Sequence, residues 1–143
     1  MRKEYAANAP IETIYFGGGT PSTLTLEQLQ KISNTIYDVH SVSPTAEVTI
    51  ECNPDDLTPE FLTQLRRLPF NRISMGVQSF DDTQLKRLGR RHNAEKARQA
   101  VANARAAGYK NISIDLMFAL PGSTAEECSA SYTYPKKARS PSP

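Results

Sequence analysis

The sequence has no tryptophan, only two cysteines and two histidines, and no long apolar run. No window approaches the roughly 18 consecutive apolar residues of a membrane-spanning helix, so no membrane span is expected. Residues 1–10 form a lead-in that lacks the apolar core of a signal peptide, which favours a cytoplasmic location. In that compartment Cys52 and Cys128 are expected to be reduced thiols rather than a disulfide.

The scarcity of histidine and cysteine also excludes an ordinary zinc site, because the four residues do not have the spacing of metal ligands. We therefore assign no metal-binding residue to this chain. His40 and His92 have no catalytic neighbours in the sequence. Cys52 is interpreted as a small filler at the end of a strand.

The charge of the chain is nearly balanced, with a net value of +2, which gives no reason to expect a polyanionic partner. One basic stretch occupies residues 86–92, but no aromatic residues are interleaved with it, so we expect no nucleic-acid binding. Within this stretch, a solvated helix end is the interpretation for Lys86, Arg87 and Arg91.

Four short runs rich in β-branched and apolar residues predict strands. They cover residues 11–16, 47–52, 72–77 and 111–118. Segments with helical periodicity separate the runs. Regular alternation of strands and helices predicts an α/β fold, with about four parallel strands joined by flanking helices in right-handed βαβ units.

Capping residues mark where the helices begin. Suitable side chains stand at Thr25, Thr58, Asp81 and Asn93. The first helix has a predicted apolar stripe of Leu26, Leu29, Ile32 and Ile36. The last helix is predicted to reach about Ala107, before a glycine suited to a helix end, with an inner stripe of Ala97, Ala100, Val101 and Ala104.

The end of the sequence differs in composition from the rest. Ser123 and Glu126 form a capping box, but no apolar stripe follows them. Residues 128–143 combine serine, proline and basic residues without periodicity, so we predict a disordered tail. The folded part is therefore expected over residues 11–127, as a parallel sheet that looks unfinished after four strands.

Polar residues and glycines stand where the predicted strands end, which is where parallel α/β folds bind ligands. Residues 17–19 are three glycines, which suit either a flexible turn or a backbone clamp for a ligand. Glu51 and Gln78 are each compatible with a solvated or capping role and with ligand binding. Asp115 lies in an otherwise apolar strand and needs a partner, which favours a functional role.

These residues belong to five motifs that resemble, in content and order, the radical S-adenosylmethionine proteins of the oxygen-independent coproporphyrinogen III oxidase family. The motifs are residues 14–22 (IYFGGGTPS), 51–54 (ECNP), 72–80 (RISMGVQSF), 88–90 (LGR), and 114–116 with 120–122 (IDL and LPG). The resemblance covers residues 11–127. Residues 78–80 and 88–92 look closer to the heme-chaperone branch of the family than to the true oxidases.

The resemblance implies a partial TIM-like (β/α) barrel with S-adenosylmethionine across its top. By motif match, the backbone of Gly18, Gly19 and Thr20 would hold the amino group of the methionine part. Arg90 would pair with the methionine carboxylate, which suits its planar guanidinium.

The remaining roles come from the same match. Glu51 and Gln78 would bond the ribose hydroxyls, and Asp115 would line the adenosine side. The resemblance implies no catalytic residue within this chain.

The chain also departs from the family. The CxxxCxxC motif, whose thiolates bind a [4Fe–4S] cluster, is absent and is expected upstream of Met1. Without those thiolates no electron reaches S-adenosylmethionine, so the chain alone is expected to be inactive.

In a complete relative, the implied partners are a porphyrinogen or heme and an electron donor. An oxidase would decarboxylate the propionate side chains of the porphyrinogen, whereas a chaperone would bind heme and hand it on. The alternative is a non-enzymatic remnant of a truncated or frameshifted gene.

Overall fold

A computed structural model describes residues 9–118 of the 143-residue chain. The elements are β1 (Ile11–Phe16), α1 (Leu26–Val39), β2 (Val42–Cys52), α2 (Pro59–Leu65), β3 (Arg72–Gln78), α3 (Asp82–Arg87), α4 (Ala94–Ala106) and β4 (Asn111–Leu116). This order confirms the predicted alternation. The capping box at Ser123 and the tail predicted to be disordered lie outside the described residues.

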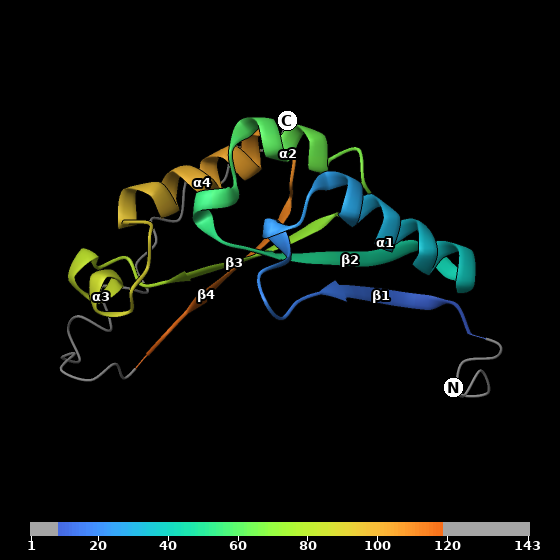
Figure 1. The fold of residues 1–143 in the computed structure, drawn as a ribbon, viewed down its shortest axis with the longest axis horizontal. Coiled ribbons are helices and arrows are strands. Elements are labelled where there is room, and N and C mark those ends of the chain that lie inside the picture. The colour runs from blue at the N-terminus through green and yellow to red at the C-terminus, as the bar shows by residue number, and fades with distance from the viewer. Residues whose placement is uncertain (1–8, 119–143) are drawn as a thin grey trace, which may run out of the picture.

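The four strands form one parallel sheet in the order β1-β2-β3-β4. Helices α1, α2 and α4 lie over the same face of this sheet, and α3 lies near the ends of β3 and β4 (Figure 1). Because all strands run the same way, their carboxyl ends meet at one edge. Within residues 9–118 the sheet is open, since β1 and β4 each pair with a single strand.

The helices begin where the predicted caps stand. The Thr25 hydroxyl accepts from the Gln28 amide at 3.2 Å, and the Gln28 side chain accepts from the Thr25 amide at 2.9 Å. This reciprocal pair satisfies two amides that helix geometry leaves without partners. The same kind of side-chain cap is found at Thr58, Asp81 and Asn93.

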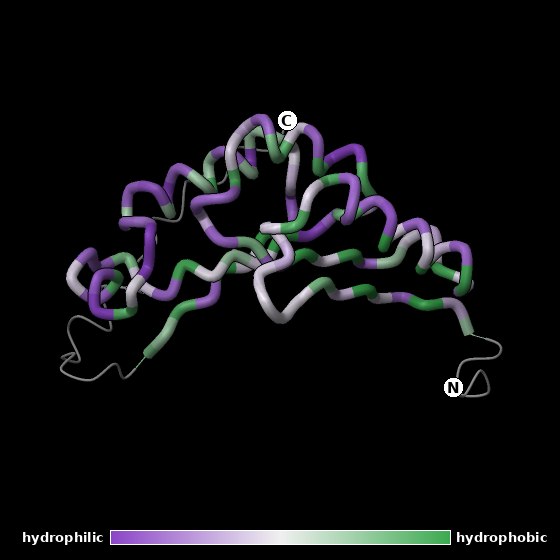
Figure 2. The backbone as a smooth tube through the Cα atoms, in the orientation of Figure 1, coloured by the Kyte–Doolittle hydropathy of each residue, from purple (hydrophilic) through white to green (hydrophobic). Residues whose placement is uncertain are grey.

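The core lies between the sheet and the helices. Alternate residues of the two central strands face the helices and are buried, namely Val48, Ile50, Cys52, Ile73, Met75 and Val77. The predicted inner stripe of α4 is buried too, and its alanines let the helix approach the sheet closely. Apolar residues follow the strands, whereas hydrophilic residues cover much of the outer surface of the helices (Figure 2).

The structure corrects three details of the sequence prediction. Strand β2 begins at Val42 instead of residue 47. Its first part contains Pro44, which suggests a turn, but Pro44 lies where the ladder to β1 is irregular and no amide is needed there. Strand β4 ends at Leu116 rather than residue 118. On α1, Ile32 is 40% exposed and so lies at the margin of the predicted apolar stripe.

No helix in the described part of the chain is long and apolar enough to cross a membrane.

Candidate functional site

A pocket of about 230 Å³ opens at the carboxyl ends of the strands. Its lining comes from Gly18, Thr20, Glu51, Cys52, Asn53, Ser74, Gly76, Gln78, Arg90 and Asp115. Six of the seven residues predicted from the sequence are therefore brought together. The seventh, Gly19, is not in the lining but lies between Gly18 and Thr20 in the loop after β1.

This loop has an unusual backbone. Gly18 has φ +106°, which L side chains rarely adopt, and Thr20 has φ +68° although it carries a side chain. The Thr20 amide donates to the Gly18 carbonyl at 2.9 Å, which closes a tight turn. A side chain at Gly17 would meet the ring of Tyr15 at 2.5 Å. The loop is thus shaped by close packing and by conformations that glycine tolerates.

Glu51 is held by two donors from the first strand and its loop. The Tyr15 hydroxyl donates to Oε1 at 2.7 Å, and the Gly18 amide donates to Oε2 at 3.0 Å. The hydrogen bond to the Glu51 carboxylate, with a smaller effect of burial, raises the pKa of Tyr15. Glu51 is half-buried, so its charge is stabilised by these contacts while it still faces the pocket.

Arg90 reaches the pocket from the segment between α3 and α4. Its Nη2 donates to Asn53 Oδ1 at 2.9 Å and to the Gly76 carbonyl at 2.8 Å. A Cβ at Gly76 would make only an ordinary contact with Nη2, at 3.6 Å, but it would lie 3.2 Å from the side-chain nitrogen of Gln78. Both bonds use one nitrogen of a group with five N–H donors, so the other edge of the guanidinium can bind an anion.

Gln78 ends β3 in a strained conformation, with φ +71°. The register between β3 and β4 shifts between Gly76 and Gln78, so the strand is irregular where it meets the pocket. A positive φ is uncommon for a residue with a long side chain.

Asp115 has a hydrogen-bond partner, as the sequence predicts, although its side chain is exposed. The Ser74 hydroxyl donates to Asp115 Oδ2 at 3.1 Å, and Ser113 donates to Ser74 at 3.2 Å. Arg72 lies next in this line, 3.5 Å from the Ser113 hydroxyl and 2.7 Å from Glu47 Oε1. A row of polar side chains thus runs toward the pocket across the sheet face opposite the described helices α1, α2 and α4.

Two residues for which the sequence predicts no functional role lie close to the site. Cys52 is buried, and burial raises the pKa of its thiol to about 12, as expected of a filler rather than a nucleophile. His92 is also buried, and its Nε2 lies 3.0 Å from the Val77 carbonyl oxygen. The other histidine, His40, is exposed at the end of α1.

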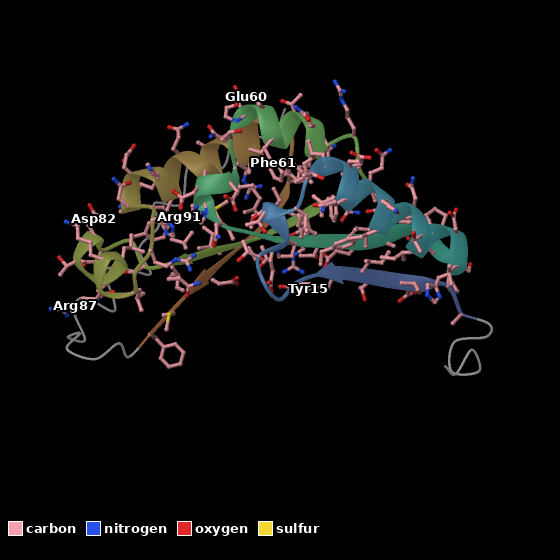
Figure 3. The ribbon with its side chains drawn as sticks, viewed as in Figure 1. Tyr15, Glu60, Phe61, Asp82, Arg87 and Arg91 are labelled. Atoms are coloured by element: carbon pink, nitrogen blue, oxygen red, sulfur yellow. The ribbon has the colours of Figure 1, made fainter. Side chains whose placement is uncertain are left out.

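The sequence motifs predict no role for Asn53, Ser74 or Tyr15, although all three residues stand inside them. Ser74 could have been found from strand alternation, since it shares a sheet face with Gln78. Nothing in the sequence indicates that Tyr15 bonds Glu51. In Figure 3, Tyr15 lies near the end of β1, whereas Glu60 lies on the outer side of α2.

Within residues 9–118 no three side chains of the metal-ligating types lie close enough to hold a metal ion. The polar groups of the pocket are instead two carboxylates, one guanidinium, two amides, two hydroxyls and backbone groups. Such a set suits an organic ligand that carries charges of both signs and hydroxyl groups.

Comparison with known proteins gives a consistent result. The sequence-family model of the radical SAM superfamily matches residues 2–133. The heme chaperones HemW of Lactococcus lactis and Bacillus subtilis are 42% and 44% identical over 116 and 115 residues, which are 81% and 80% of this chain. The oxygen-independent coproporphyrinogen III oxidase of Synechocystis is 36% identical over 112 residues, or 78% of this chain.

A solved structure agrees with these relatives. Coproporphyrinogen III oxidase (HemN) from Escherichia coli, described as a radical SAM enzyme, superimposes with a TM-score of 0.76 at 30% identity over 84% of this chain. The match covers 28% of that protein, and the chain spans 31% and 30% of the two HemW relatives and 24% of the Synechocystis oxidase. The open four-stranded sheet therefore corresponds to part of a TIM-like barrel.

Proposed function

Because this chain belongs to the radical SAM superfamily, we propose that the pocket at its strand ends binds S-adenosylmethionine. The observation that carries the proposal is the convergence of Arg90, Glu51 and Asp115, from three separate segments, on one pocket. Their charges complement a ligand with a carboxylate, an ammonium group and a sulfonium. The donor set therefore fits this cofactor.

Each part of the cofactor has a matching group. The free edge of the Arg90 guanidinium would bind the methionine carboxylate. The backbone of Gly18, Gly19 and Thr20 accounts for the amino group. The carbonyls of Gly18 and Thr20 already accept hydrogen bonds within the loop, but a carbonyl oxygen has two lone pairs and can also accept from an ammonium group.

The adenosine part is assigned to the other side of the pocket. Glu51 and Gln78 would bond the ribose hydroxyls, and Asp115 would line the adenosine side. The pocket volume of about 230 Å³ is below the roughly 300–1,000 Å³ of sites that enclose a ligand of this size. The described residues thus supply one wall of a larger site.

The [4Fe–4S] cluster of the superfamily does not fit the residues of this chain. A cluster site with one open iron needs three thiolates, and the sequence has two cysteines. We therefore propose that this chain binds S-adenosylmethionine without cleaving it. Anaerobic reconstitution with iron and sulfide, followed by reduction, is expected to give no 5′-deoxyadenosine; formation of that product would contradict the proposal.

For a longer protein that contains this chain, we propose heme-chaperone activity rather than coproporphyrinogen oxidation. The two HemW relatives at 42% and 44% identity support this choice, and at the same 36% identity the HemW of Synechocystis matches over 124 residues against 112 for the oxidase of that organism. The expected result is a heme absorption band upon titration of the longer protein. Decarboxylation of coproporphyrinogen III would instead favour the oxidase.

Calorimetric titration with S-adenosylmethionine and with S-adenosylhomocysteine tests the binding proposal. We expect saturable binding to the wild-type chain, and a loss of about tenfold or more in Asp115→Asn, since one charged hydrogen bond is worth about 1.5–3 kcal/mol. Glu60→Gln is the matched control, because Glu60 is an exposed carboxylate on α2 (Figure 3). Absence of binding, or an equal loss in both variants, would contradict the proposal.

A further inference from the structure

Gln78 occupies the centre of a strained turn. Its φ is +71°, and across it the Ser79 amide donates to the Val77 carbonyl at 2.9 Å. A γ-turn is closed by a hydrogen bond between residues i and i+2. When the central residue has a positive φ, as Gln78 does, the turn is of the rare, high-energy form. Such strain persists only where surrounding contacts hold it, and it is concentrated at functional sites.

Two contacts hold the carbonyls on either side of this turn. The Met117 amide donates to the Gln78 carbonyl at 2.8 Å. The imidazole Nε2 of His92 lies 3.0 Å from the Val77 carbonyl oxygen, which also accepts the Ser79 amide. Because a carbonyl oxygen can only accept, Nε2 must carry the hydrogen.

His92 is well placed to act as a fixed support. Its side chain is 1% exposed, and its Nδ1 lies 3.7 Å from Asp55 Oδ2. The Asp55 carboxylate thus faces the ring nitrogen that does not bond the turn, at more than hydrogen-bond distance. Its burial and its bond to the Val77 carbonyl leave the His92 ring little rotational freedom.

The segment that carries His92 also carries Arg90. The Arg90 Nη2 donates to the Gly76 carbonyl at 2.8 Å, and His92 bonds the carbonyl of the next residue, Val77. Two side chains, two residues apart, thus bond two successive carbonyls of β3. This double contact fixes the pocket end of the strand, and Gln78 follows immediately.

We propose that His92 is a positioning residue for the cofactor pocket: its Nε2–H holds the strained turn that directs Gln78 into the site. The inference rests on the proposed function for the identity of the ligand. Loss of the donor would leave the Val77 carbonyl with the Ser79 amide alone and let Gln78 relax to a negative φ. The Arg90 segment would lose one of its two bonds to β3 at the same time.

Three variants test the proposal in the full chain. His92→Leu removes the donor at similar volume, His92→Gln keeps an amide N–H that can reach the Val77 carbonyl, and His40→Leu is the control at the exposed histidine. The first readout is hydrogen exchange of the Ser79 and Met117 amides by nuclear magnetic resonance. The second is affinity for S-adenosylhomocysteine.

The expected result is faster exchange of both amides in His92→Leu and about tenfold weaker binding, as for the loss of one buried hydrogen bond. His92→Gln should restore both readouts, and His40→Leu should change neither. A purely structural role would lower thermal stability without rescue by Gln and without a local change at these amides. Unchanged exchange in His92→Leu would overturn the proposal whatever the affinity.

The proposed function and the role of His92 can fail independently of each other. If the wild-type chain binds no S-adenosylhomocysteine or S-adenosylmethionine, the proposed function fails, while the exchange data still decide whether His92 holds the turn. If His92→Leu does not fold, the position of the hydrogen on the His92 ring of the wild-type chain tests the proposal instead. The nitrogen-15 shifts of the ring should show a hydrogen on Nε2, and a neutral ring with its hydrogen on Nδ1 would overturn the proposal.

Discussion

The hydroxyl of Tyr15 donates a 2.7 Å hydrogen bond to Oε1 of Glu51, although the two residues lie on different strands. The other carboxylate oxygen accepts from the Gly18 amide, so both oxygens are oriented by β1 and the loop after it. A carboxylate has about four lone-pair positions, so it can still accept from a ligand. The acceptor is thus oriented before a ligand binds, which lowers the entropic cost of binding.

Replacement of Tyr15 by phenylalanine tests this preorganisation. We expect Tyr15→Phe to weaken S-adenosylhomocysteine binding by about threefold to tenfold, because a net hydrogen bond is worth about 0.5–1.5 kcal/mol. The melting temperature should change little, since Tyr15 is 58% exposed. Tyr37→Phe is the matched control, because Tyr37 is 43% exposed on α1. Equal affinities for all three proteins would contradict the expectation.

The same contact predicts an altered titration of the phenol. The hydrogen bond to Glu51 raises the pKa of Tyr15 above its ordinary value of 10.0. The Glu51→Gln variant removes the charge, so the pKa should fall back toward that value. Ultraviolet titration of wild type and Glu51→Gln, each compared with its Tyr15→Phe derivative, isolates this group. A Tyr15 pKa that is the same with Glu51 and with Gln would show that the carboxylate does not act on it.

The guanidinium of Arg90 should not be replaceable by an ammonium group. Its Nη2 already bonds Asn53 and Gly76, and an anion would need the remaining donors. A lysine offers a point charge in place of the planar fork, so Arg90→Lys should lose about tenfold in affinity or more. Arg87→Lys, on the exposed end of α3 (Figure 3), is the control and should bind as wild type.

Much of the fold follows from the sequence because its signals are local. Capping side chains such as Thr25 and Asn93 determine where helices begin without reference to distant residues. A place in the pocket lining was also predictable where a polar residue interrupts an apolar strand, as Asp115 does. The contacts of Tyr15 with Glu51 and of His92 with Val77 were not predictable, because they join residues far apart in the chain.

The burial of helix α1 shows where periodicity alone is insufficient. Leu29 is fully buried, whereas Ile32, in the same predicted stripe, is 40% exposed. The periodicity gives the direction of a stripe but not the width of the surface that covers it. The sheet covers Leu29 and leaves Ile32 at its margin.

These two residues offer a matched pair of substitutions. Leu29→Ala should reduce the free energy of unfolding by about 2–5 kcal/mol, because it leaves a cavity in the core. Ile32→Ala should reduce it by less than about 1 kcal/mol, since the side chain already contacts water and little apolar area is lost. Urea denaturation measures both. Similar losses for the two variants would show that Ile32 is covered in solution.

The thiol of Cys52 predicts how stability depends on alkaline pH. Burial raises its pKa from 9.0 to about 12, so the folded chain keeps a proton that the unfolded chain releases above pH 9. The free energy of unfolding should therefore be unaffected by this group below pH 9 and fall between pH 9 and 12. Burial also raises the pKa of Tyr109, which acts in the same direction.

Comparison with Cys52→Ala separates the thiol from the phenol. The variant loses packing at every pH, but its stability should fall less steeply above pH 9 because only Tyr109 still contributes. In a Cys128→Ser variant, Cys52 is the one remaining cysteine of the sequence. It should react slowly with a thiol reagent at pH 8, because only a small fraction is thiolate at that pH and the side chain is buried. If the free energy of unfolding fell equally steeply with pH in the two proteins, or if the folded chain were labelled rapidly, Cys52 would be accessible to solvent.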